Sequence, residues 1–127
     1  MRISDVLRSK GSSVATVDPG ISVSGLIAEL ARHNVGAMVV VENDDVVGIV
    51  SERDVVRQIH ERGAELLNAR VAEIMTSSVF TCLPTDSVDS LAATMTERRI
   101  RHMPVVVDGR LRQISHEEFH THLEMAP

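Results

Sequence analysis

An internal repeat constrains this chain more than any other feature of its sequence. The segment VATVDPGISVSGLIAELARHNVGAMVVVENDDVV, Val14 to Val47, aligns without a gap on VFTCLPTDSVDSLAATMTERRIRHMPVVVDGRLR, Val79 to Arg112, at a shift of 65 residues. The leader RISDVL from Arg2 also matches RVAEIM from Arg70. A unit of about 60 residues buries only about 60% of its unfolded surface, so one copy alone is marginally stable. We therefore expect two copies, residues 1–69 with a leader helix and residues 70–127, packed as a pseudo-twofold pair.

Each copy alternates between strand and helix signals. The short runs VATV and VFTC, each with a proline two residues later, predict a strand and its exit. Apolar residues at helical spacing follow, and Ser22 and Ser87 stand where an N-cap belongs. Two hairpins are predicted, AMVVV with VVGIV joined at residues 43–45, and MPVVV with RLRQI joined at residues 108–109. A last helix that begins at Ser51 completes the order β-α-β-β-α, so the fold class is α/β.

Composition excludes several kinds of partner. The formal net charge is -5, and Phe80 and Phe119 are the only aromatic residues, so the chain lacks both a basic excess and a platform of stacked rings for nucleic acid. Its start lacks the apolar core of a signal peptide, and no run approaches membrane-spanning length. The single cysteine, Cys82, fits a reducing compartment and is expected in the core. We expect a cytoplasmic protein with no nucleic-acid or membrane partner.

Several segments carry a family resemblance: HNVGAMVVV leading to VVGIVSERDVV in the first copy, and VAEIMT with MTERRIRHMPVVVDGRL in the second. They resemble a tandem pair of cystathionine-β-synthase (CBS) domains, the arrangement called a Bateman module, and the resemblance weakens only after Leu111. It implies regulation by an adenosine compound (AMP, ADP, ATP, NAD or S-adenosylmethionine) bound in clefts between the paired domains. It also implies frequent homodimerisation and no catalysis by the module itself, so we expect no enzyme activity and no required cofactor.

The resemblance places the ligand chemistry in the segment SERD, residues 51–54. It implies that Asp54 binds the ribose and that the Ser51 hydroxyl lies near the phosphate. A carboxylate can accept hydrogen bonds from both ribose hydroxyls, and such charge-assisted bonds are about twice as strong as neutral ones. Independently, a helix that begins at Ser51 offers free N–H groups and its positive dipole end to phosphate, and Arg53 can add a donor. The predicted ligand-binding residues are Thr16, Val35, Ala37, Met38, Ser51, Arg53, Asp54, Arg101, His102, Met103, Pro104, Ser115 and Glu118.

The same tetrapeptide has a structural interpretation. Ser51 and Asp54 have the spacing of a capping box, in which the side chains at both ends satisfy free N–H groups of the helix. The two roles compete, because an Asp54 side chain turned back to its own helix start is less free to hold a diol. The repeat context puts ligand binding on at least an equal footing with capping.

The second copy departs from the first where binding would need it to match. It reads RQIS where the first copy reads VGIVS, so one residue is missing. We expect its third strand to be shortened, bulged or differently paired. Arg112 and Gln113 then stand where Val47 and Gly48 do, and the ligand motif becomes SHEE at residues 115–118. The second site is expected to be weakened, altered or empty.

A basic cluster precedes the MPVVV run, with Arg98, Arg99, Arg101 and His102 close together in sequence. One interpretation is a phosphate funnel beside the ligand cleft. The other is a solvated helix end whose cations complement the helix dipole. We favour the solvated helix end for Arg98 and Arg99, and the phosphate role for Arg101.

The segment HEEFH contains H-E-x-x-H, the spacing by which a helix offers His116 and His120 to zinc with Glu117 as the base. Zinc hydrolysis needs a third ligand and an open position, and His122 would face away, about 200° around the helix from His120. At a shift of 64 the segment aligns on the last helix of the first copy, so we interpret the motif as coincidental. A zinc hydrolase remains the remote alternative.

We predict a ligand-sensing regulatory module that binds an adenosine-containing ligand near Asp54. No catalytic or DNA-binding domain is recognisable in the sequence, so its signal would leave through a homodimer interface or an unidentified effector protein. The alternative is a ligand-free structural or interaction module whose sites have decayed, as the altered second copy suggests.

Overall fold

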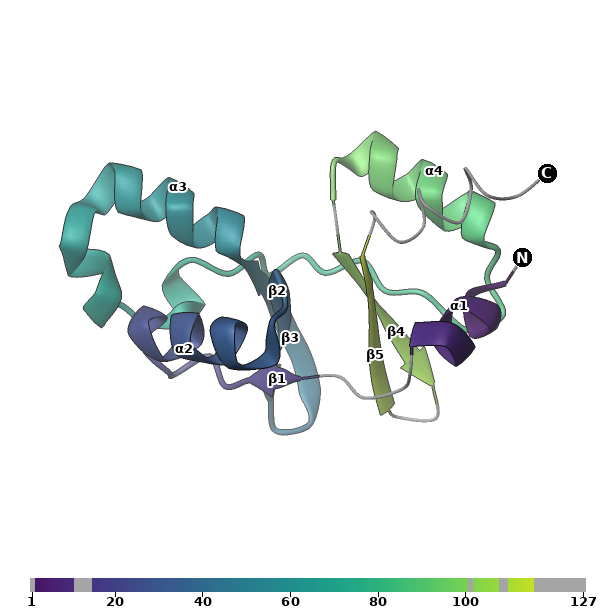
Figure 1. The fold of residues 1–127 in the computed structure, drawn as a ribbon, viewed down its shortest axis with the longest axis horizontal. Coiled ribbons are helices and arrows are strands. Elements are labelled where there is room, and N and C mark those ends of the chain that lie inside the picture. Colours follow the sequence, from purple (N-terminus) through teal and green to yellow (C-terminus); the bar gives the residue numbers. More distant parts are fainter. Residues whose placement is uncertain (1, 11–14, 101, 108–109, 116–127) are drawn as a thin grey trace. The chain divides into compact units, whose positions relative to one another are not determined.

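The computed structural model describes residues 2–10, 15–100, 102–107 and 110–115, and the chain forms two compact units (Figure 1). The first unit, residues 15–79, contains β1 (Thr16–Val17), α2 (Val23–His33), β2 (Ala37–Glu42), β3 (Asp45–Ser51), α3 (Glu52–Arg62) and the 3-10 helices η1 (Gly63–Asn68) and η2 (Val71–Glu73). The second unit joins residues 1–14 to residues 80–127 and contains α1 (Ile3–Lys10), α4 (Val88–Arg98), β4 (His102–Val107) and β5 (Arg110–Ser115). The predicted α/β class is confirmed.

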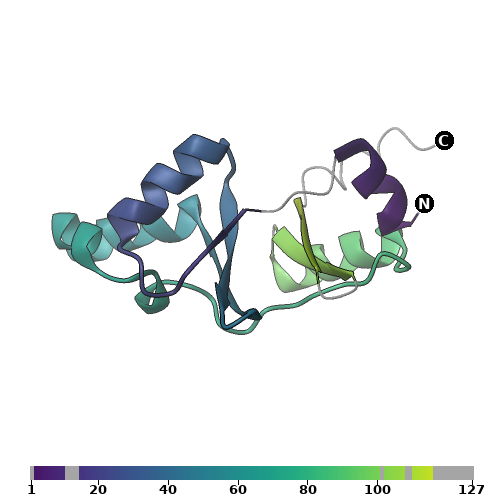
Figure 2. The same cartoon turned by 90° about the horizontal axis from the view of Figure 1, so that it is seen from below.

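The first unit is a three-stranded sheet with two helices on one face. Its strand order is β1-β2-β3, with β1 parallel and β3 antiparallel to β2. Helices α2 and α3 lie on the same side of the sheet in both views (Figures 1 and 2). Alternate residues of β2 explain this layering, because Met38 and Val40 join Leu26 of α2 and Val55 of α3 in one buried cluster. Val39 points to the other face and is also fully buried.

The β2–β3 hairpin turns through two residues in the left-handed region. Asn43 has φ 52° and Asp44 has φ 66°, and the register runs from Glu42 opposite Asp45. Such turns match the twist of the flanking strands, and Asn and Asp tolerate positive φ better than most residues. The predicted hairpin is therefore confirmed, with Asp45 as the first residue of β3 rather than part of the turn.

The two central helices begin at the predicted caps. The Ser22 hydroxyl accepts from the backbone N–H of Gly25 at 3.0 Å, and the Ser87 hydroxyl accepts from that of Ser90 at 3.1 Å. Each bond satisfies one of the donors that a helix start leaves without an intrahelical partner. Helices α2 and α4 each have 11 residues, and each buries a stripe of apolar side chains at matching positions.

The second unit packs α1 and α4 around the β4–β5 hairpin. The cluster contains Met95 of α4 and Val105 of β4, both fully buried, together with Cys82. The predicted strand VFTC is reduced to a bridge, in which the N–H of Cys82 donates to Pro104 O and the N–H of Val106 donates to Cys82 O, both at 3.0 Å. Its core position confirms the expectation for Cys82, and burial raises the pKa of this thiol to about 12.

Each unit is completed by the leader that precedes the other copy. Helix α1 buries Ile3 and Val6 in the second unit, and the N–H groups of residues 3 and 4 donate to Asp86 O and Pro84 O, both at 3.0 Å. In the first unit the N–H groups of residues 71 and 72 donate to Ile21 O and Pro19 O at 2.9 and 3.0 Å, which is the same pair of bonds one repeat earlier. The predicted boundary between the two sequence copies, at residues 69 and 70, stays a prediction. The compact units instead divide the chain after residues 14 and 79, because each leader packs with the copy that it does not precede.

The hairpins of the two copies differ by a bulge. In the first, Val40 pairs with Gly48 but Val41 pairs with Val46, so Val47 is the extra residue. The β4–β5 hairpin keeps one register from His102 opposite Ser115 to Val107 opposite Arg110. Strand β5 has six residues and β3 has seven, so the expected shortening is confirmed, and the bulge lies in the first copy.

This register corrects one sequence alignment. Arg112 pairs with Val105, as Gly48 pairs with Val40, so Arg112 stands where Gly48 does and not where Val47 does. The position is crowded in the first unit, where a Cβ on Gly48 would lie 2.6 Å from Met75 Sδ and 3.0 Å from Thr76 O. Residue 76 covers this strand edge by exchanging two backbone bonds with Ile49, at 3.0 and 2.9 Å.

Candidate ligand site

Three chain segments converge at one end of the first sheet. Ala37, at the start of β2, pairs with Ser51, at the end of β3, and the N–H of Glu52 donates to Gly36 O at 2.9 Å. Strand β1 lies beside β2 with Thr16 paired to Val39. The topology therefore brings the entries of two strands and the start of α3 to the same end of the sheet.

Only part of the predicted base-contacting segment is accessible. Ala37 and Met38 are fully buried, and Met38 belongs to the apolar cluster under α2. Val35 is 38% exposed, and Thr16 is exposed at the start of β1. Ala37 and Met38 therefore serve the core in this structure, and ligand contact by any residue of this segment stays a prediction.

Ser51 and Asp54 form a complete capping box at the start of α3. The backbone N–H and the hydroxyl of Ser51 donate to Oδ2 of Asp54 at 2.8 and 3.0 Å. In return, the N–H of Asp54 donates to the Ser51 hydroxyl at 3.2 Å. The structural role weighed from the sequence is thus present, and both half-buried side chains are engaged in it.

The capping box also reduces what the helix start offers to an anion. Three backbone N–H groups at this start, those of Ser51, Glu52 and Asp54, already donate to protein oxygens. A phosphate usually binds a helix start through such N–H groups and the dipole. Arg53 is exposed in this turn, so its guanidinium is the accessible donor that the sequence predicted.

The second-copy residues are described only in part. Met103 and Pro104 are buried, and His102 is half-buried. Arg101 and Glu118 lie outside the described residues, as does the side chain of Ser115. The HEEFH segment of the zinc alternative, with His116, Glu117 and His120, also lies outside them.

Two kinds of site have no counterpart in the part of the chain that the structure describes. Among those residues, no three His, Cys, Asp or Glu side chains gather in a metal-binding group. Within the same ranges, every helix is too short or too polar to cross a bilayer.

The basic cluster lies at the end of α4. Arg98 is exposed in the last turn, and its guanidinium lies 4.8 Å from the centroid of the Phe80 ring. Arg99 is the C-cap, with φ 58° and ψ 36° in the left-handed region. Both positions agree with the interpretation as a solvated helix end, and the stacking on Phe80 adds a cation–π contact that the sequence did not predict.

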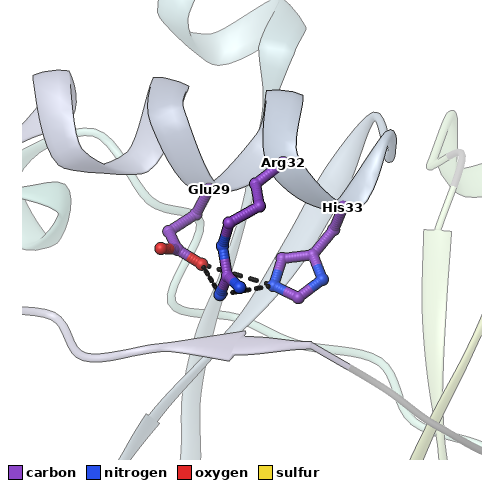
Figure 3. A network of polar contacts seen from close by, with 3 residues as sticks. All are labelled: Glu29, Arg32 and His33. Atoms are coloured by element: carbon purple, nitrogen blue, oxygen red, sulfur yellow. Dashed lines mark hydrogen bonds and ion pairs between the residues drawn. The ribbon is translucent and has the colours of Figure 1, made fainter.

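A second charged cluster lies at the end of α2, where Glu29, Arg32 and His33 point toward one another (Figure 3). Glu29 Oε2 is 2.8 Å from Arg32 Nη2 and 3.3 Å from His33 Nε2. The hydrogen bond from Arg32 is the largest cause that lowers the pKa of Glu29. The spacing of three and four residues is typical of helix surface pairs, so this signal was present in the sequence but was missed. Such exposed pairs contribute little to stability.

The repeats identify the class of protein. A model of the CBS domain matches residues 3–61 and again residues 71–114, so the chain belongs to the CBS domain family. The chain is a CBS domain pair, a regulatory module, and the resemblance seen in the sequence is confirmed.

Solved structures and curated relatives agree with this class. A CBS-domain protein from Agrobacterium tumefaciens has a TM-score of 0.91 and 36% identity, with 97% of this chain and 99% of that chain covered. The mitochondrial CBS domain-containing protein CBSX3 of Arabidopsis thaliana is 38% identical over 84% of this chain, which spans 56% of the relative's length. The CBS domain pair of the protein MJ0100, in complex with 5′-methylthioadenosine and S-adenosylmethionine, has a TM-score of 0.85. The alignment covers 98% of this chain and 96% of that chain. Its identity of 24% supports the fold alone.

Proposed function

We propose that this CBS pair is a sensor of an adenosine-containing ligand, which it binds in the first copy through Asp54. The observation that carries the proposal is the Asp54 carboxylate, half-buried at the start of α3, where the entries of β1 and β2 meet the end of β3. A carboxylate at such a place is suited to accept hydrogen bonds from ribose hydroxyls. The CBS domain pair of MJ0100, which shares this fold, is in complex with two adenosine compounds, and we extend that ligand class to this chain as part of the proposal.

An adenine base would find aliphatic rather than aromatic groups near this site. Val35 is exposed just before β2, and the chain has only two aromatic residues, so a purine would rest on aliphatic groups and backbone. Arg53 would add a guanidinium donor for a phosphate or carboxylate of the ligand. The proposal also includes a second site in the second copy, with Arg101, Ser115 and Glu118, which we expect to bind the ligand more weakly or to stay empty.

Thermal unfolding with added ligands tests the proposal. We expect AMP, ADP, ATP, NAD or S-adenosylmethionine to raise the Tm, because a ligand at one hundred times its Kd stabilises the folded state by about 2.7 kcal/mol. Asp54→Ala should abolish the ligand-induced shift. The matched control is Asp89→Ala, which removes an equally charged residue from the first turn of α4. Each variant is compared with its own ligand-free Tm, since loss of the cap alone costs about 1 kcal/mol.

The signal requires a partner, and we propose a homodimer that uses the outer face of α3. Val56 is 68% exposed and Ile59 is 42% exposed, and their spacing of three residues puts them on one side of this helix. Ligand binding would be communicated through this dimer or to an effector protein. Sedimentation of Val56→Asp, expected to be monomeric, tests the interface. The cytoplasmic location and the absence of a required cofactor stay predictions, and the Arabidopsis relative is named as mitochondrial.

A ligand-free interaction module is the second candidate. It is favoured by the capping box, because Oδ2 of Asp54 is already held by two donors. No Tm shift with any of the five compounds would support this candidate and contradict the first. Zinc-dependent peptide hydrolysis, abolished by Glu117→Ala, would instead support the remote hydrolase alternative.

A further inference from the structure

Met75 differs in exposure from the other methionines within the described ranges. Met38 and Met95 are fully buried and Met103 is 2% exposed, whereas Met75 is half-buried at the surface of the first apolar cluster. A methionine that reaches solvent is open to oxidation to the sulfoxide, which is polar and disturbs apolar packing. Among these side chains, Met75 is therefore the one that an oxidant reaches most readily.

The Met75 side chain packs where a larger group has little room. A Cβ added to Gly48 would lie 2.6 Å from Sδ and 3.0 Å from Cγ of Met75, so the thioether lies directly against the glycine. An oxygen added to Sδ increases both the volume and the polarity of this side chain, and close-packed apolar contacts tolerate neither change well. The thioether fits this place against β3 better than the sulfoxide does.

The next residue ties the connection between the two units to the first sheet. The N–H of Thr76 donates to Ile49 O at 2.9 Å, and the N–H of Ile49 donates to Thr76 O at 3.0 Å. Gly48 and Ile49 are neighbours in β3, so the Met75 contact and this bridge fasten the connection at the same point. Residues 77–79 then lead to the second unit. The bridge thus depends on the apolar contact beside it.

We propose that Met75 is an oxidation site for hydrogen peroxide, and that its conversion to the sulfoxide releases Thr76 from β3. In this reaction the Sδ lone pair attacks one peroxide oxygen, and the S–O bond forms as the O–O bond breaks. The leaving hydroxide takes the proton of the transferred oxygen and becomes water, so sulfur loses two electrons and the peroxide gains them. Release adds residues 75 and 76 to the connector of residues 77–79. The proposal goes beyond the adenosine function and does not depend on it.

The order of oxidation is the first test. The full chain is treated with limiting hydrogen peroxide, digested with trypsin and analysed by mass spectrometry. Sulfoxide should form at Met75 at least about ten times faster than at Met38, Met95 or Met103, because oxidation follows exposure. Met75 and Met95 share the tryptic peptide of residues 71–98, so fragment ions are used to separate them.

Hydrogen exchange, followed by NMR, tests the release. In the oxidised protein the N–H groups of Ile49 and Thr76 should exchange about tenfold faster or more, because local opening exposes them. The N–H of Val71, which donates to Ile21 O at 2.9 Å in the same leader, should keep its rate. Methionine sulfoxide reductases that act on both epimers should restore slow exchange, since this oxidation is reversible.

Two variants separate the sulfur from the packing. Met75→Leu keeps an apolar side chain of similar size and copies Leu7 of the first leader. Peroxide should leave the exchange of Ile49 and Thr76 unchanged in this variant. Met75→Gln places a polar group of similar length against Gly48 and should give fast exchange at both residues without peroxide.

The outcomes that contradict the proposal are distinct. Oxidation of the buried methionines at the same rate as Met75 would overturn the assignment of the site. Unchanged exchange at Ile49 and Thr76 in the oxidised protein, or an equal increase in peroxide-treated Met75→Leu, would overturn the release. An increase of the same size at Val71 would indicate general unfolding and would overturn it as well.

Discussion

The two hairpins of this chain differ by one residue, and the structure places that residue away from the candidate site. In β2–β3 the bulge lies at Val47, near the turn, whereas the pairs next to α3 run regularly to Ala37 opposite Ser51. In β4–β5 the corresponding pair is His102 opposite Ser115. The deletion removes the bulge and leaves the register at the site end intact, so Ser115 keeps the position of Ser51.

The exchanged leaders give the largest expected difference between the units. All the cluster residues of the first unit lie within residues 15–79, but the second unit needs Ile3 and Val6 from the leader. We expect a fragment of residues 15–79 to fold alone, with marginal stability, and a fragment of residues 80–127 to remain unfolded. Circular dichroism at 222 nm with urea titration measures both. A cooperatively folded 80–127 fragment would contradict the role given to the leader.

The comparison also separates what the sequence predicts from what it does not. The caps at Ser22 and Ser87 and both hairpins were predictable, because caps, turn residues and apolar periodicity are local signals. The leader exchange was not, since it depends on which copy a short amphipathic helix meets in space. The missing residue was placed after Leu111 because the two copies align without a gap up to Arg112, whereas the strand pairing shows that Val47 is the extra residue. Sequence alone could name Asp54 but could not show that both the backbone N–H and the hydroxyl of Ser51 donate to its carboxylate.

Gly48 provides the next largest test of the difference between the hairpins. Gly48→Ala should destabilise the protein by about 2 to 3 kcal/mol, because the new Cβ would lie 2.6 Å from Met75 Sδ and 3.0 Å from Thr76 O. The double variant with Met75→Ala should recover only part of this, since the Thr76 contact is backbone. At the equivalent position, Arg112→Gly should cost about 1 kcal/mol or less. Urea unfolding measures all three, and a neutral Gly48→Ala would refute the close approach.

The equivalent core positions Val17 and Cys82 predict a smaller, pH-dependent difference. Burial raises the pKa of the folded Cys82 thiol to about 12, whereas the pKa of the unfolded thiol lies near its ordinary value of 9.0. Its contribution is therefore fully present below pH 9 and is lost as the pH rises from 9 toward 12. Cys82→Val, which copies the first unit, should remove this loss, which is about 1 kcal/mol at pH 10 after allowance for solvent screening. Parallel alkaline melts of the two proteins would show no divergence if the thiol ionised normally.

The smallest expected effect lies at the C-caps of α2 and α4. Asn34 and Arg99 occupy equivalent left-handed positions, with φ 52° and 58°, and both cap N–H groups bond to the preceding turn. Asn tolerates this conformation because its short side chain bonds locally, whereas a long side chain is strained there. Arg99→Asn should therefore stabilise the second unit by about 0.5 kcal/mol, since a small loss of favourable charge at the helix end offsets part of the gain. Asn34→Arg should destabilise the first unit by a similar amount.

The chain has no Trp or Tyr, so urea unfolding of the three proteins is followed by circular dichroism. Equal stability of all three proteins would mean that the two caps do not differ in strain.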